Sequence, residues 1–221
     1  MFMNNIIQTI AVYALPVLFA ITLHEAAHAF AAKYFGDSTA YVLGRMSLNP
    51  IKHIDPFGTI LIPLVLYMAT SGAFLFGYAK PVPIDFGQLR NPRRQTAWVA
   101  LAGPAANFVM ALLWMIAAIL MRAMQIEEEF FPQMAHAGIL VNVLMFSFNL
   151  LPILPLDGGR ILNSFLPIKL SYQFSRIEPY GLFIVLALIY FKILNFWVLP
   201  LMLLTDSVLR MITYPLISFL N

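Results

Sequence analysis

Long apolar segments separated by short polar ones make up most of this chain. A helix needs about 20 apolar residues to cross a bilayer. Three segments are clear candidates for such spans: 6–32, 95–121 and 134–151, the last running on towards Leu156. A further apolar region, 180–220, is long enough for two spans with a break near Asn195 or Pro200. The pattern predicts an all-α polytopic membrane protein with about five to six membrane segments.

The apolar run 57–78 contains Pro63, Gly72 and Gly77, and it can either cross the bilayer or enter it and return. Charge helps to decide, because Lys and Arg concentrate on the cytoplasmic side of membrane proteins. The segments 33–95 and 157–178 are rich in Lys and Arg, whereas the loop 122–133 carries three consecutive glutamates. A re-entrant 57–78 puts both basic segments inside and puts the N-terminus and the glutamates outside. We therefore expect re-entrance.

Residues 39–48 are rich in β-branched and aromatic residues, contain Gly44 and are followed by Asn49-Pro50. This pattern predicts a short β-hairpin over 36–50. An open strand edge is not tolerated against lipid, so the hairpin should lie at the interface, against protein or along a watery cleft. An ordinary interfacial loop is the alternative.

The composition agrees with a membrane protein. Of the 221 residues, 61% are hydrophobic and only 10% are charged, whereas soluble domains have about 25% charged residues. Cysteine is absent, which excludes disulfides, thiolate ligands and a thiol nucleophile. The net charge of +3 arises in the loops and indicates orientation rather than nucleic-acid binding. The opening MFMNN lacks basic residues, so we do not expect a cleaved signal peptide.

A metal-binding pattern interrupts the first apolar segment. Between residues 6 and 32, the only acidic, basic or histidine side chains are His24, Glu25 and His28. On a helix, positions i and i+4 share a face, so both imidazoles can bind one metal ion, and the adjacent glutamate is placed as a general base. A chance match is the alternative. It is disfavoured because a charged group in hydrocarbon costs about 2–3 kcal/mol or more.

A catalytic zinc ion normally has three protein ligands, so one more is needed. His24 and His28 precede Lys33 by nine and five residues, which places them roughly 8–14 Å inside the cytoplasmic boundary. Asp157 fits this depth, because it follows an apolar segment broken by two prolines and precedes two glycines that permit a sharp turn. Alternatively, Asp157 caps a short helix over 158–165.

Four motifs occur together: the HEAAH run at 24–28, LAGPAAN at 101–107, Asn149-x-x-Pro152-x-x-Pro155, and Leu156-Asp157-Gly158. With these motifs, the chain resembles the site-2 protease family of intramembrane zinc metalloproteases over about residues 20–160. The motif that begins at Asn149 and ends at Gly158 is far more specific for this family than the HEAAH pattern. Many members insert a PDZ domain between the second and third core spans. In this chain only residues 122–133 occupy that position, so it resembles a compact member without the domain.

The resemblance implies a role for each matching residue. One Zn²⁺ ion would be bound by His24, His28 and Asp157, with Glu25 as the catalytic base. Asn107 and Asn149 would contact the substrate backbone or the oxyanion, although a buried asparagine can also simply link two helices. The helix that contains Gly103 would pack against the metal helix within a three-helix catalytic core, and a re-entrant β-hairpin would follow the metal helix. The chain 1–221 would then be a single intramembrane protease domain, with a core at about 6–165 and C-terminal membrane segments at about 180–220.

The expected function is that of an intramembrane zinc endopeptidase acting on single-span or other membrane-protein substrates, in contact with the lipid bilayer and without nucleic acid. The alternative is a membrane metal-ion transporter that uses the His/His/Asp cluster. Transport pathways show polar residues at several depths, whereas this chain concentrates them at one level and adds Glu25. A bacterial plasma membrane is the expected location. The oligomeric state is left open.

Overall fold

Four long helices form the frame of the protein. The structure, a computed structural model, describes residues 2–61, 65 and 80–220. The long helices are α1 (Phe2–Phe35), α4 (Pro92–Ala123), α5 (Phe130–Asn149) and α9 (Asn195–Leu220). Each contains a stretch long and apolar enough to cross a membrane. The chain is therefore a multi-pass membrane protein.

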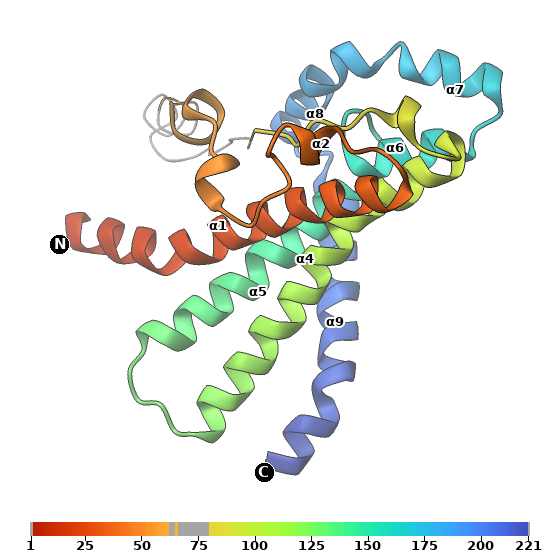
Figure 1. The fold of residues 1–221 in the computed structure, drawn as a ribbon. Coiled ribbons are helices and arrows are strands. Elements are labelled where there is room, and N and C mark those ends of the chain that lie inside the picture. Colours follow the sequence, from red (N-terminus) through yellow and green to blue (C-terminus); the bar gives the residue numbers. More distant parts are fainter. Residues whose placement is uncertain (1, 62–64, 66–79, 221) are drawn as a thin grey trace.

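Shorter elements connect the long helices. They are α2 (Thr39–Val42), η1 (Pro50–Lys52), η2 (Pro56–Leu61), η3 (Phe86–Gln88), α6 (Asp157–Phe165), α7 (Ile168–Ser175), η4 (Glu178–Tyr180) and α8 (Gly181–Tyr190). Figure 1 shows α2, α6, α7 and α8 gathered at the end of the bundle where α4 begins, while α9 diverges from α4 and α5 towards its C-terminus. The connection between α4 and α5 runs only from Ala123 to Phe130, too short for a folded domain.

Helices α1, α4 and α5 pack on one another, as expected for a three-helix core. Small residues permit this close packing. Ala20, Ala29 and Ala32 on α1 are fully buried. On α5, a Cβ added to Gly138 would lie 2.3 Å from the Trp114 ring of α4, so only glycine fits there. The core therefore depends on small residues at the points where its helices meet.

The predicted β-hairpin over 36–50 is wrong, because these residues contain the helix α2 and no strand. Asp37 is the physical reason. Its Oδ1 accepts hydrogen bonds from the backbone N–H and the hydroxyl of Thr39, which begins a helical turn. Ala40 is then buried against Ala29 and Val82. These hydrogen bonds and this burial outweigh the β propensity of the surrounding residues.

The number of membrane segments is confirmed only in part. The predicted break near Asn195 is confirmed, since α9 begins at that residue. However, α8 has only ten residues, too few to cross a bilayer. The described residues thus hold four candidate spans, and the predicted total of five to six membrane segments is not confirmed. The re-entrance expected for 57–78 falls almost wholly outside the described residues.

Candidate metal centre

Two imidazoles face each other on the buried side of α1. His24 and His28 lie one helical turn apart and are 5% and 7% exposed. Their Nε2 atoms are 3.1 Å apart, and the two rings meet nearly edge to face. The HEAAH spacing therefore brings both nitrogens to one point, as the sequence predicted.

Asp157 reaches the same point from the start of α6. Its Oδ2 lies 3.3 Å from Nε2 of His24 and 3.4 Å from Nε2 of His28. Leu156 occupies the N-cap position of α6, and Asp157 belongs to the first turn, so its carboxylate does not serve as the cap. A Cβ added to Gly158 would lie 2.3 Å from the carbonyl oxygen of Leu150. Glycine thus lets α6 pack directly on the loop that precedes it.

Hydrogen bonds fix the orientation of each ring. Nδ1 of His28 lies 2.7 Å from the carbonyl oxygen of Val99, which can only accept, so Nδ1 carries the proton. Nδ1 of His24 lies 2.6 Å from Oδ1 of Asn107. The amide of Asn107 is itself oriented, because its Nδ2 donates to the carbonyl oxygen of Ala20 and to Oδ1 of Asn142. With Nδ1 as the donor, each ring in its neutral form directs an Nε2 lone pair at Asp157.

The donor set fits a zinc ion. Two Nε2 lone pairs and a carboxylate oxygen converge, and Oδ2 of Asp157 is buried without a hydrogen-bond donor. Three acceptors this close repel one another unless a cation lies between them. Tetrahedral zinc with bonds of about 2.0–2.2 Å holds its ligand atoms about 3.3–3.6 Å apart. The observed separations of 3.1–3.4 Å are close to that range.

Gly103 on α4 makes room for both rings. A Cβ at this position would lie 2.3 Å from Nε2 of His28 and 2.6 Å from Cε1 of His24. Any other residue would therefore occupy the space in which the imidazoles meet. The resemblance implied that this helix packs against the metal helix, and the small side chain at 103 permits the close approach.

Glu25 lies beside the three candidate ligands. Its Oε2 accepts a hydrogen bond of 2.7 Å from the backbone N–H of Val82. Pro81 and Pro83 flank Val82 and have no N–H, so this is the single backbone donor of that tripeptide. Glu25 and the three candidate ligands line a cavity of about 570 Å³. Sequence reasoning missed Val82, Val99 and Asn142, because backbone groups and a third asparagine carry no recognisable motif.

The two asparagines expected to contact substrate have different surroundings. Asn149 lines the cavity, and its amide donates to the carbonyl oxygen of Met145. Asn107 is fully buried and is absent from the cavity lining, and its amide is occupied by His24, Ala20 and Asn142. The contacts of Asn107 are those of a residue that positions His24. Substrate contact by either asparagine stays a prediction.

Replacing Asn107 by leucine should weaken zinc binding about 10–100-fold, because loss of such an outer hydrogen bond releases the ring of His24. Zinc affinity of the purified protein, measured by competition with a chelator, checks this. Asn142→Leu should have a smaller effect, because Asn107 keeps its bond to the carbonyl of Ala20. Unchanged affinity in Asn107→Leu would show that helix packing alone orients His24.

Comparisons with known proteins agree with this geometry. The model of peptidase family M50 matches residues 12–191. YwhC of Bacillus subtilis, provisionally named as a zinc metalloprotease, is 38% identical over 181 residues, covering 78% of this chain and 77% of that protein. Rip2 of Mycolicibacterium smegmatis, named in the same way, is 34% identical over 182 residues, covering 81% of this chain and 67% of that protein. No solved structure matches the chain significantly.

Proposed function

Because the chain belongs to peptidase family M50 and is a zinc metalloendopeptidase, we propose that it cleaves its substrates within the membrane. The observation that carries this proposal is the position of the candidate metal site. His24 and His28 are buried on α1, which is itself long and apolar enough to span a bilayer. A peptide bond cleaved at this site must enter the protein at membrane depth. The substrates are therefore single-span or other membrane proteins.

His24, His28 and Asp157 hold the zinc ion in this proposal, and Glu25 is the catalytic base. Zinc, when bound, supplies a Lewis acid that acidifies a water molecule and polarises a peptide carbonyl. Glu25 accepts the proton of the attacking water and then transfers it to the leaving amine. The N–H of Val82 holds one oxygen of Glu25, which leaves the other oxygen to handle the proton. Asn149, on the cavity wall, is placed to bind the substrate backbone.

The substrate must lose its helical structure at the cleaved bond, because a helix hydrogen-bonds its own carbonyls. Inside a membrane, backbone groups freed in this way need new partners from the protein. The site lies near the basic ends of α1 and α4, which carry Lys33, Arg93 and Arg94. By the distribution of Lys and Arg, this end is cytoplasmic. Cleavage then occurs near the cytoplasmic end of a transmembrane segment, in a bacterial plasma membrane.

The test uses the full chain in lipid vesicles with a panel of single-span membrane proteins. We expect cleavage inside the transmembrane segment of at least one substrate, loss of cleavage on zinc chelation, and recovery when zinc is restored. Mass spectrometry of the products locates the cut bond. Cuts confined to soluble loops would contradict intramembrane cleavage but leave the zinc peptidase intact. Cleavage that survives complete zinc removal would contradict the catalytic role of the metal.

A further inference from the structure

Helix α9 carries an ion pair at the middle of its length. Nε of Arg210 lies 2.7 Å from Oδ2 of Asp206, one turn earlier. Asp206 follows the first residue of α9 by eleven positions, and Arg210 precedes the last by ten. At 1.5 Å per residue, each charge is therefore about 15 Å from the nearer helix end. In a helix that crosses the bilayer, this depth is the centre of the hydrocarbon.

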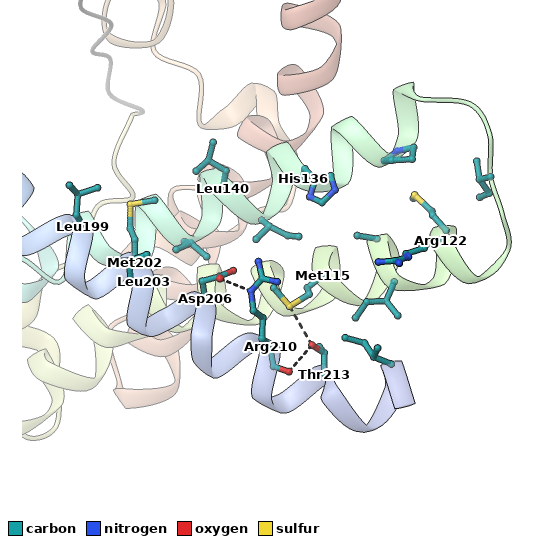
Figure 2. Close-up of a pocket in the computed structure, with 18 residues that line it drawn as sticks. Met115, Arg122, His136, Leu140, Leu199, Met202, Leu203, Asp206, Arg210 and Thr213 are labelled. Carbon is teal, nitrogen blue, oxygen red and sulfur yellow. Dashed lines mark hydrogen bonds and ion pairs between the residues drawn. The ribbon is translucent and has the colours of Figure 1, made fainter. Parts of the chain in front are cut away.

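The ion pair lines a groove of about 770 Å³ between α4, α5 and α9. Figure 2 shows Asp206 and Arg210 on α9 beside Met115 of α4 and His136 of α5. The lining is mostly apolar, and Thr213 donates a hydrogen bond to the sulfur of Met115 at 3.4 Å. The side chain of Arg210 is 72% exposed and that of Asp206 is 36% exposed. The pair is thus accessible from the groove.

Ionisable side chains at this depth almost always face protein or a water-filled cavity, because hydrocarbon cannot solvate them. Within the described residues, the guanidinium of Arg210 bonds only to Asp206, and the side chain stays largely exposed. A mostly apolar groove with two opposite charges at its side suits an apolar helix that carries matching charges. A partner helix of this kind would complete the packing around α9.

We propose that this partner is the α9 helix of a second copy of the chain. In a two-fold contact, residue i meets residue j of the other copy and the reverse also holds, so the surface must complement itself. Asp206 and Arg210 satisfy this requirement, because they are opposite in charge, share one face and lie one turn apart. In two parallel α9 helices related by a two-fold axis, equivalent residues lie at the same depth. Asp206 of each copy is therefore one turn from Arg210 of the other, a separation that the long arginine side chain can span. The dimer therefore replaces two exposed pairs by one buried network.

Other occupants match the charges less well. The phosphate of an anionic lipid would pair with Arg210, but it would be repelled by Asp206. A helix from another protein would need its own acidic and basic residues at the same depth and spacing. The second copy has them by symmetry.

The first experiment is disulfide cross-linking, which is unambiguous because the chain has no native cysteine. Leu203 lines the groove and is 71% exposed, whereas its neighbour Leu204 is 60% exposed but does not line the groove. We expect Leu203→Cys to form a covalent dimer in lipid vesicles at low protein density. The matched Leu204→Cys should stay monomeric. These single changes leave the charges and the catalytic site untouched.

The second experiment separates pairing between copies from pairing within one helix. Asp206→Arg gives one copy two cations, and Arg210→Asp gives another copy two anions, so neither helix keeps its own pair. When the two variants carry different tags and are reconstituted together, the mixed dimer should exceed the like dimers about tenfold or more. Each variant alone should dissociate to monomers.

The proposal is overturned if Leu203→Cys yields no dimer, since the groove would then face lipid or another protein. Equal cross-linking by Leu204→Cys would also overturn it, because the contact would be random collision. If both charge variants insert and the mixed dimer shows no excess, the reciprocal ion pairs do not exist. The cysteine result is decisive even where a charge variant fails to insert.

Discussion

Glu25→Gln should abolish most peptide hydrolysis while the protein still binds zinc. A missing general base costs about 10²–10⁴-fold in rate. Glutamine has the same shape, and its carbonyl oxygen can still accept the hydrogen bond from the N–H of Val82. The local structure should therefore be kept while proton transfer is lost. Single-turnover cleavage of a reconstituted substrate, with zinc content measured on the same sample, checks this prediction.

Comparing zinc content with activity in two variants separates a catalytic base from a metal ligand. Asp157→Ala serves as the comparison, because it should lower the zinc content as well as the activity. If Glu25→Gln loses zinc, its carboxylate belongs to the metal site rather than to the proton transfer. If it cleaves at the normal rate, the base is another residue, and the assignment of Glu25 is wrong.

The second large effect is expected at Gly103. A valine there places its Cβ 2.3 Å from Nε2 of His28, and two further methyl groups have no free space. Overpacking of this kind costs about 1–3 kcal/mol, and here the displaced groups are the two imidazoles themselves. We expect zinc binding and cleavage to be lost together. Zinc stoichiometry and cleavage of the Gly103→Val protein measure this.

Ala105→Val is the matched control, because Ala105 lies on the same helix but is exposed. It should keep both zinc and activity. Thermal unfolding of both variants shows whether Gly103→Val still forms the helical bundle. A folded Gly103→Val protein with normal zinc content would contradict the packing of α4 against the two histidines.

The candidate site could be predicted from the sequence because its chemistry has a strict spacing. His24 and His28 must share a helix face, and the proline-broken segment before Asp157 has few other uses in a membrane. The long helices were predictable for a similar reason, since a bilayer imposes a minimum apolar length. The packing of α4 against α1 followed from the family resemblance of 101–107. These features depend on local pattern alone.

Other features depend on contacts between distant residues. The turn at Thr39 is helical because Asp37 accepts hydrogen bonds from the N–H and hydroxyl of Thr39. Asp37 in turn accepts one of 2.8 Å from the backbone N–H of Asp85. Neither contact is visible in the β-rich pattern of 39–48. The proton positions on the two imidazoles depend on Val99 and Asn107, which lie more than 70 residues away in the chain. Such long-range partners are set by the fold.

The three candidate ligands come from two elements that are far apart in the sequence, α1 and the beginning of α6. A bound ion therefore does for this cysteine-free chain what a disulfide does elsewhere, because it ties the first helix to the segment after α5. Ligand binding to the native state alone stabilises a protein by about 4 kcal/mol at a thousand times the dissociation constant. The supply of free zinc should thus raise the free energy of unfolding as well as support activity.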